Sequence, residues 1–393
     1  MKKALALLTA SALALSLAAC GGSTSSTAAS TADDTSSAAE STDAADSADA
    51  AGEDVSGANV AVFYYTYGDT YISSVRTALD ADLSAAGIAY QDYDSNNNQT
   101  TQNEQIDTAL ASGANLLIVN LVTSGSPDAA SAICDKAAAA GVPVIFFIRA
   151  IEADGSEGDF LNKYDNIAFV GTDAPEAGHM QGQMIGNYVV ENFDAIDLNG
   201  DGVISYAMFK GEAANVEAIY RTQYAVEDAD SVITAAGKPA LEYFDASNAD
   251  KFQLDLQGAW SAQAAQEYMQ TNLSQYSEAN GNMIELIICN NDNMAEGCVA
   301  ALNTAGYNTG DGTTTTIPVF GVDATDSAKE LIAAGKMTGT IKQDAEGMAE
   351  CIAALATNAA TGKDLMDGTE SYTKDTANNL NNKIFIAYQE YTG

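Results

Sequence analysis

Short apolar segments alternate with amphipathic ones along most of the chain. The apolar segments lie at residues 60–66, 88–94, 115–120, 142–148, 166–172, 203–210, 240–245, 284–290, 317–323, 337–343 and 382–389. Between them, residues such as 70–87 and 99–113 place apolar side chains at helical spacing. Short apolar runs that alternate with helical segments are typical of parallel strands covered on both faces. The pattern therefore predicts an α/β fold.

The number of predicted strands indicates two sheets, because one doubly wound sheet of this length would hold fewer. Ligands of such sheets bind beyond the carboxyl ends of the strands. Polar residues occur at several of these ends, namely Asp69, Asn120, Asn291, Asp292 and Asp323. Some of them could instead be helix N-caps. Together they favour a shared cleft.

The N-terminus has the features of an export signal. Lys2 and Lys3 precede an apolar stretch at 4–19, which is too short to span a membrane. Residues 1–19 are therefore predicted to be a signal peptide. The string Leu-Ala-Ala-Cys at 17–20, followed by two glycines, resembles the lipobox of bacterial lipoproteins and implies a lipid on Cys20. The alternative is an ordinary secretory signal with a chance cysteine.

Residues 20–58 differ in composition from the rest of the chain. They are rich in Ser, Thr, Ala and Gly, with eight acids and no Lys or Arg, so we expect a disordered tether. Residues 59–393 carry −32 of the total net charge of −38. A surface this acidic repels phosphate backbones, which excludes nucleic-acid binding as a function.

The remaining cysteines and the single histidine indicate no catalytic or metal chemistry. Cys134, Cys289, Cys298 and Cys351 lack CxxC or zinc-type spacing, and we expect buried free thiols. His179 lies in a helical segment, and the sequence has no GxSxG or HExxH motif. We therefore expect a protein that is not an enzyme. A glycoside-processing enzyme that uses paired carboxylates is the less favoured alternative.

Several strings resemble the periplasmic galactose/glucose-binding protein family. They are VNLV (119–122), GVPVIFF (141–147), FVGTD (169–173), DLNGDGVIS (197–205), FKGE (209–212), CNNDNMAEG (289–297), VFGVDAT (319–325) and GTIKQD (339–344). The resemblance covers residues 59–393 in order. It implies a type I periplasmic-binding-protein fold, with two doubly wound parallel-sheet lobes joined by a three-segment hinge. The implied lobes are residues 59–150 with 343–375, and residues 151–342 with 376–393.

The resemblance also implies a function and partners. A binding protein of this family captures a solute by lobe closure and delivers it to an ABC permease with its ATPase subunits. The chain itself has no G-x-x-x-x-G-K-[ST] motif, so the energy would come from those subunits. The chain order is also similar to the effector-binding half of sugar-responsive repressors, but here a signal and an acidic stalk replace the DNA-binding headpiece. We expect a monomer held outside the cytoplasm by its lipid.

Residues 197–205 match the first nine positions of a calcium-binding loop, with oxygen ligands at alternate positions and a glycine at the turn. The Glu that completes an EF-hand is absent, since Met208 stands there. The resemblance implies a carboxylate from a distant strand instead. The predicted ligands of a structural calcium ion are Asp197, Asn199, Asp201, Val203 (through its carbonyl), Ser205 and Glu285. A plain turn is the alternative.

A sugar requires aromatic surfaces for its C–H faces and hydrogen-bonding side chains for its hydroxyls. The resemblance places such contacts at Asp69, Tyr71, Asn120, Asn215, Glu217, Arg221, Trp260, Asn291, Asp323 and Gln343. Tyr71 and Trp260 would sandwich the ring. Taken alone, Trp260 could be a helix core residue and Arg221 a surface residue paired with Glu217.

Four of these positions depart from the family pattern. Tyr71, Asn215, Glu217 and Gln343 stand where the family usually has Phe, His, Asp and Asn, and two of the changes lengthen a side chain. We expect a hexose of the galactose or glucose type. A pentose or another sugar, or a role as a sugar sensor feeding chemotaxis, are the alternatives.

Overall fold

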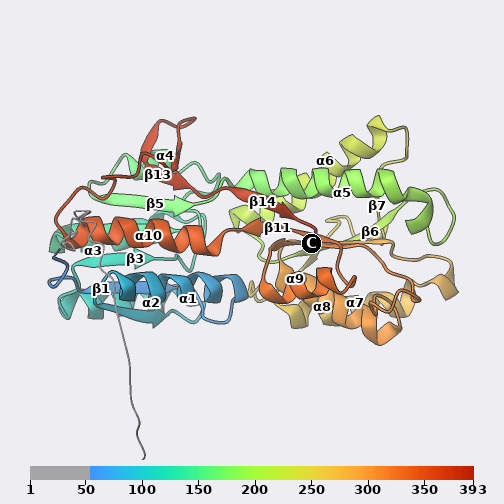
Figure 1. Cartoon of the computed structure of the whole chain (residues 1–393), viewed down its shortest axis with the longest axis horizontal. Coiled ribbons are helices and arrows are strands. Elements are labelled where there is room, and N and C mark those ends of the chain that lie inside the picture. The colour runs from blue at the N-terminus through green and yellow to red at the C-terminus, as the bar shows by residue number, and fades with distance from the viewer. Residues whose placement is uncertain (1–53) are drawn as a thin grey trace, which may run out of the picture. The chain divides into compact units, whose positions relative to one another are not determined.

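The computed structural model describes residues 54–393, which lie in one compact unit (Figure 1). The predicted signal peptide, Cys20 and most of the predicted tether lie outside the described residues. Within the described part, every apolar segment predicted to be a strand overlaps at least one. The strands form two parallel-dominated sheets covered by helices, which confirms the predicted fold class.

The first sheet has seven strands in the order β12-β13-β5-β4-β3-β1-β2. These strands are β1 (Val60–Tyr64), β2 (Tyr90–Asp94), β3 (Leu116–Val119), β4 (Val144–Phe147), β5 (Ile167–Gly171), β12 (Thr373–Asp375) and β13 (Leu380–Phe385). All pairings are parallel except that of β12 with β13. Because parallel pairing needs a crossover, a helix follows each of the first four strands.

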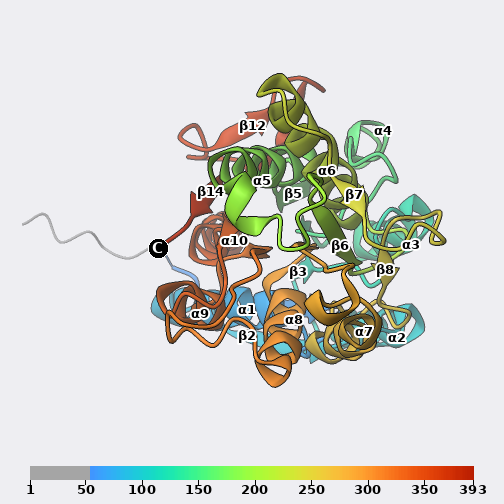
Figure 2. The ribbon, with the colours of Figure 1, turned by 90° about the vertical axis from the view of Figure 1, so that its right-hand side faces the viewer.

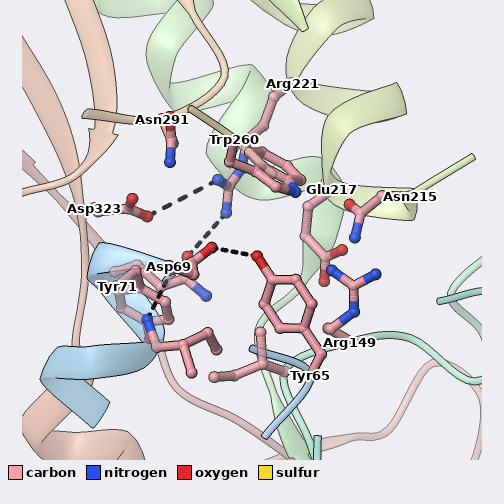
Figure 3. A pocket seen from close by; sticks show the side chains of 13 residues that line it. Tyr65, Asp69, Tyr71, Arg149, Asn215, Glu217, Arg221, Trp260, Asn291 and Asp323 are labelled. Atoms are coloured by element: carbon pink, nitrogen blue, oxygen red, sulfur yellow. Dashed lines mark hydrogen bonds and ion pairs between the residues drawn. The ribbon is translucent and has the colours of Figure 1, made fainter. Parts of the chain in front are cut away.

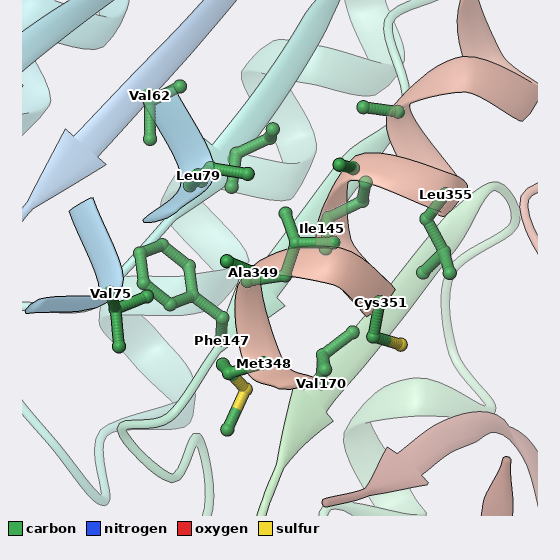
Figure 4. Packing of buried hydrophobic residues seen from close by; sticks show 14 of the residues in the cluster. Val62, Val75, Leu79, Ile145, Phe147, Val170, Met348, Ala349, Cys351 and Leu355 are labelled. Carbon is green, nitrogen blue, oxygen red and sulfur yellow. The ribbon is translucent and has the colours of Figure 1, made fainter. Parts of the chain in front are cut away.

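Both faces of the first sheet are covered by helices. In β1, Val60 and Val62 pack under α1 (Thr70–Ala85) and α10 (Ala345–Ala360). Phe63 packs on the other face with α2 (Gln99–Ala111), α3 (Pro127–Ala140) and α4 (Gly158–Leu161). Figure 4 shows the first of these cores, where α10 lies over β4 and β5. Burial on both faces explains why the β1 sequence is apolar throughout rather than alternating.

The second sheet also has seven strands, in the order β14-β11-β10-β9-β6-β7, with β8 paired to β6. They are β6 (Ser205–Lys210), β7 (Glu242–Tyr243), β8 (Gln253–Leu254), β9 (Leu286–Cys289), β10 (Val319–Asp323), β11 (Gly339–Gln343) and β14 (Tyr388–Tyr391). β14 pairs antiparallel with β11. Helices α5 (Ala174–Ile196) and α6 (Val216–Ala235) cover one face, and α7 (Ala262–Gln275), α8 (Asp292–Ala305) and α9 (Asp326–Ala333) cover the other (Figure 2).

Helices α5 and α6 pack closely against each other, and a glycine permits it. A Cβ at Gly182 would lie 2.5 Å from the carbonyl oxygen of Tyr224 and 2.7 Å from the Cβ of Asp228. A larger residue would therefore push α6 away from α5. The close packing matters because the first turns of α6 carry residues of the cavity described below.

The chain crosses between the sheets three times, after β5, after β11 and after β13. These crossings correct the predicted lobe boundaries. β5 pairs with β4, and β13 pairs with β5, so both belong to the first sheet. The first lobe therefore comprises residues 54–171 and 345–385, and the second lobe comprises residues 174–343 and 388–393. The sequence shows that a strand exists but not which sheet it joins.

The last predicted strand, 382–389, is in fact two strands in different sheets. β13 ends at Phe385 and β14 begins at Tyr388, so one crossing passes through only Ile386 and Ala387. The Tyr388 hydroxyl donates to Oγ1 of Thr172, at 2.8 Å, and thereby ties this crossing to the one after β5. The crossing segments thus support one another at the junction of the lobes.

The four cysteines of the described chain are buried and free, as predicted. The sulfurs of Cys289 and Cys298 lie 3.9 Å apart without a bond between them. Between residues 54 and 393, no helix has the length and apolarity to cross a membrane.

Candidate functional site

A cavity lies where the carboxyl ends of strands from both sheets meet (Figure 3). It is lined by Tyr65, Asp69, Tyr71, Ile72, Ile148, Arg149, Asn215, Glu217, Arg221, Trp260, Asn291, Asp323 and Gln343. All of the predicted sugar-contact residues except Asn120 are among them. Both lobes contribute, and the second lobe contributes the larger share.

Several cavity residues are also helix caps, so the two interpretations left open by the sequence are compatible. Asp69 accepts a hydrogen bond from the backbone N–H of Ile72 at the start of α1, at 2.9 Å. Its other oxygen accepts from the hydroxyl of Tyr65, at 2.6 Å. Asn215 and Asn291 cap α6 and α8 through their amide oxygens. Capping fixes these side chains, and it leaves each amide nitrogen available to donate elsewhere.

Arg221 is the best-connected side chain of the cavity. It is 3% exposed. It donates to the carbonyl of Asn290 at 3.0 Å, to Oε1 of Gln343 at 2.9 Å and to the hydroxyl of Tyr388 at 3.1 Å. Burial alone would lower the pKa of Arg221, but nearby Tyr388 and Asp323 raise it, so the guanidinium stays charged. Arg221 is thus a buried cation rather than a surface residue.

Two buried acids lie near this cation. Asp323 has an oxygen 4.0 Å from a guanidinium nitrogen of Arg221. Burial raises the pKa of Asp323 well above its usual value, and Arg221 opposes that rise. Burial likewise raises the pKa of Glu217. An anionic ligand would meet these carboxyl groups in a water-poor site, so the arrangement suits an uncharged ligand better.

The cavity gathers polar atoms that have no partner within the protein. Of the ten buried side-chain polar atoms without a hydrogen bond in residues 54–393, five belong to cavity residues. They are the Tyr71 hydroxyl, Nε of Arg149, Oε2 of Glu217, Nε of Arg221 and Nε2 of Gln343. A buried polar group without a partner costs about 1–3 kcal/mol. Donors and acceptors left open in one cavity therefore indicate a ligand that hydrogen-bonds in both directions.

Three lining residues have backbone conformations that side chains rarely adopt. The φ angles of Ile148, Trp260 and Asp323 are 62°, 54° and 125°. Such conformations cost about 1–3 kcal/mol each and persist where the surrounding structure enforces them. For the β-branched Ile148 the angle is a clear outlier. These residues lie at the ends of β4 and β10 and in the loop before α7, and their side chains line the cavity.

Trp260 lies directly against a glycine. A Cβ at Gly211 would come within 2.2 Å of two ring carbons of Trp260, so the ring occupies the space that a side chain would need. The carbonyl of Trp260 accepts from Nδ2 of Asn293 at 2.9 Å, which fixes the loop. Trp260 precedes Ser261, the N-cap of α7, and so lies outside the helix. Its ring is buried in the cavity wall rather than in a helix core.

Asn120 is placed differently from the prediction. Its side chain accepts from the backbone N–H of Tyr65 at 3.2 Å and donates to the carbonyl of Phe147 at 3.0 Å. It therefore joins the ends of β1, β3 and β4 and does not line the cavity. An Asn at a strand end can be a ligand contact, a cap or such a bridge, and the sequence does not distinguish them.

Two polar lining residues were not predicted, Tyr65 and Arg149. Tyr65 directly follows β1, and Arg149 lies two residues after β4. The rule that ligands bind beyond strand ends applies to both, so that rule could have found them. Arg149 donates to the carbonyl of Val122 and to both carboxylate oxygens of Glu212. Its guanidinium lies over the Tyr65 ring, 4.2 Å from the centroid.

The loop at 197–205 connects α5 to β6 in the second lobe, and none of its residues lines the cavity. Glu285, fully buried before β9, reaches it across the fold. Oε1 of Glu285 accepts from the backbone N–H of Leu198 at 2.8 Å, and Oε2 accepts from that of Ser205 at 2.9 Å. Burial raises the pKa of Glu285, and these N–H groups oppose the rise.

The oxygen atoms of this loop are of the type that calcium prefers. In the described conformation, however, the carboxylates of Asp197, Asp201 and Glu285 are engaged by backbone N–H groups. No group of three or more His, Cys, Asp or Glu side chains within residues 54–393 is arranged to hold a metal ion. The donor types fit calcium, and their present arrangement is that of a hydrogen-bonded turn.

Comparisons with known proteins identify the class. Residues 60–364 match the periplasmic binding protein domain. The chain is 33% identical over 317 residues to the D-galactose/methyl-galactoside binding periplasmic protein MglB of Haemophilus influenzae, covering 80% of this chain and 86% of that protein. The chain therefore belongs to the periplasmic binding protein family. Its members are extracytoplasmic solute-binding proteins rather than enzymes, which confirms the predicted family and the predicted lack of enzymatic activity.

Solved structures agree with this fold. An ABC transporter solute-binding protein from Bacillus halodurans with bound myo-inositol aligns with a TM-score of 0.60 at 22% identity, covering 85% of this chain and 94% of that one. One from Actinobacillus succinogenes with bound D-allose aligns with a TM-score of 0.62 at 18% identity, covering 85% and 97%. At these identities the similarity shows the fold alone.

The contact of Gly211 with Trp260 leads to a prediction. Gly211→Ala should displace the indole ring, because the new Cβ would overlap it. Trp260 is the only tryptophan, so the emission of the ligand-free protein should shift to longer wavelength as the ring gains water. Gly158→Ala is the matched control, since a Cβ there meets nothing within 4 Å. An unchanged emission spectrum in a folded Gly211→Ala variant would show that the ring does not lie where described.

Proposed function

We propose that this protein captures a monosaccharide, a hexose of the galactose or glucose type, and delivers it to an ABC permease. The observation that carries the proposal is the set of open donors and acceptors in one cavity beside Trp260 and Tyr71. A sugar hydroxyl both donates and accepts, and a pyranose face is apolar. The cavity offers both kinds of partner together with aromatic surface.

The relatives support this ligand class. The protein from Haemophilus influenzae binds galactose and methyl-galactoside according to its name, and the two solved structures hold myo-inositol and D-allose. All of these ligands are uncharged rings with several hydroxyl groups. Glu217 and Gln343 are longer than the residues that the family usually has there, so another cyclic polyol of similar size is the second candidate.

The proposed mechanism is closure of the two lobes around the sugar. The three crossing segments form the hinge, and the cavity is lined from both lobes. A ligand that contacts both lobes binds the closed arrangement better than the open one, and it shifts the population accordingly. The closed form would then be the one that the permease recognises. The same closed form could serve a chemotaxis receptor.

Titration tests the ligand. The chain from residue 21 onwards should bind D-galactose or D-glucose with a calorimetric stoichiometry of one and a change in Trp260 fluorescence. Asp323→Asn should weaken binding by about 100-fold, or about 2.7 kcal/mol, because it replaces a carboxyl oxygen of a buried site with an amide group that can only donate there. Asp326→Asn, which changes an exposed carboxylate three residues away, is the control. No response to any hexose, pentose or inositol would contradict the proposal.

We also propose that the loop at 197–205 binds a calcium ion together with Glu285. Support comes from the oxygen donors at alternate positions and from the buried carboxylate, which has no cationic side chain as a partner among the contacts of this loop. Binding would require the carboxylates to exchange backbone N–H groups for the ion. The bound charge would hold the connection between α5 and β6 in place.

Calcium should therefore raise the melting temperature of the wild-type protein relative to EDTA, by several degrees at a concentration 100 times the dissociation constant (about 2.7 kcal/mol). Glu285→Gln should abolish that difference, and Glu278→Gln, at an exposed position nearby, should keep it. Equal melting temperatures of the wild type in calcium and in EDTA would leave a plain turn as the explanation.

We further propose that Cys20 carries a lipid that anchors the protein outside the cell membrane. The Leu-Ala-Ala-Cys-Gly-Gly string and the acidic segment after it support this. A cell that produces the full chain should incorporate a labelled fatty acid into the wild type and into Cys134→Ala but not into Cys20→Ala. Label retained in Cys20→Ala would contradict the anchor.

A further inference from the structure

An ion pair connects the two lobes beside the cavity. Arg149 follows β4 of the first sheet, and Glu212 follows β6 of the second. Nη2 of Arg149 lies 2.8 Å from Oε2 and 3.1 Å from Oε1 of Glu212. Other ion pairs, such as Lys383 with Glu157 or Lys136 with Asp107, stay within the first lobe. Because its two residues belong to different lobes, the Arg149–Glu212 pair exists only while the lobes are together.

The first lobe holds Arg149 from one side. The same Nη2 donates to the carbonyl of Val122 at 2.8 Å, and the guanidinium lies over the ring of Tyr65. The hydroxyl of Tyr65 in turn donates to Asp69, a predicted sugar contact. These contacts place the guanidinium at the cavity wall in Figure 3. They supply no carboxylate partner to Arg149 itself.

The second lobe completes the arrangement. The side chain of Arg149 is 4% exposed and that of Glu212 is 24% exposed, so the cation is far more buried than its partner. Burial alone would lower the pKa of Arg149, but Glu212 leads the neighbours that raise it. With Glu212 engaged at Nη2, the Nε of Arg149 remains buried and without a partner in the cavity lining.

From this geometry we propose that Glu212 is a positioning residue that latches the closed lobes and orients Arg149 towards the ligand. The proposal rests on the proposed function, because the ligand is the sugar of that function. In the open arrangement Arg149 is hydrated and Glu212 is exposed, so the pair adds its interaction energy to the closed arrangement alone. The latch should therefore slow release of the ligand more than it speeds capture.

Glu212→Gln tests the latch, because it keeps the shape of the side chain and removes its charge. With D-galactose as the probe, stopped-flow fluorescence of Trp260 should show a dissociation rate about ten-fold faster and an association rate changed less than two-fold. Glu212→Asp, which keeps the charge, should restore part of the slow release. Glu227→Gln removes one charge from the exposed face of α6 and should release galactose at the wild-type rate.

Salt provides a second readout. The sugar is uncharged, so a salt-dependent release rate must come from the protein's own charges. Wild-type release should accelerate between about 50 mM and about 1 M salt, where the Debye length falls from over 10 Å to about 3 Å, and Glu212→Gln release should not. A wild-type release rate for Glu212→Gln, or an acceleration by salt in Glu212→Gln equal to that of the wild type, would overturn the latch.

A ligand-free measurement separates failure of the latch from failure of the proposed function. Without sugar, small-angle X-ray scattering at low salt should give Glu212→Gln a larger radius of gyration than the wild type and Glu227→Gln. High salt should bring the wild type towards the Glu212→Gln value. If no galactose binds but the radii differ as expected, the ligand assignment is wrong and the latch stands. Equal radii for the three proteins at low salt would overturn the latch whatever the sugar does.

Discussion

The burial of one guanidinium, that of Arg221, is the constraint on which the site and the junction of the lobes depend. A buried charge must find hydrogen-bond partners, and Arg221 takes them from the end of β9, from Gln343 at the end of β11 and from Tyr388 at the start of β14. Two of these partners border the crossings between the lobes, and Tyr388 also holds Thr172 at the third crossing. The close packing of α6 on α5 at Gly182 places Arg221 in reach of all three. The cavity and the three crossings thus share one hydrogen-bond network, so a substitution in one should alter the geometry of the other.

That network explains why the cavity is left with open polar atoms. The protein itself supplies most of the hydrogen-bond partners of its buried polar side chains, as it does for Asp69 and Asn215 at helix N-termini. The atoms that remain, such as Nε of Arg221 and Oε2 of Glu217, belong to residues that line the cavity and have no hydrogen-bond partner within the protein. Strained backbone at Trp260 and Asp323 holds the surrounding side chains in position. Because these side chains are already ordered, less conformational entropy of the protein is lost when a ligand binds. Fixed side chains also favour a ligand whose hydroxyl groups match their positions.

Local pattern in the sequence was enough for the elements but not for their assignment to sheets. The apolar run of β1 and the helical spacing of α1 predict both elements, because burial and periodicity are local properties. The sheet that β5 joins, and the break between β13 and β14, depend on pairing with strands far away in the chain. Most cavity residues were found through resemblance to a family. Asn120 was misplaced because one amide at a strand end can serve three purposes. The rule on strand ends could have found Arg149 at the cavity, but an arginine after a strand carries no signal of the lobe that supplies its partner.

The two arginines of the cavity differ in the lobe that supplies their carboxylate partners. One pair lies within a single lobe, and the other pair connects the two lobes. Arg221 and Asp323 both belong to the second lobe, so that half of the site is complete before the lobes close. Arg149 belongs to the first lobe and finds Glu212 only across the cleft. An uncharged ligand brings no counter-ion of its own, so each buried cation needs a carboxylate from the protein. In the closure that we propose, the first lobe obtains its carboxylate as the lobes meet, so the charge balance of the site would be reached in the same movement that encloses the ligand.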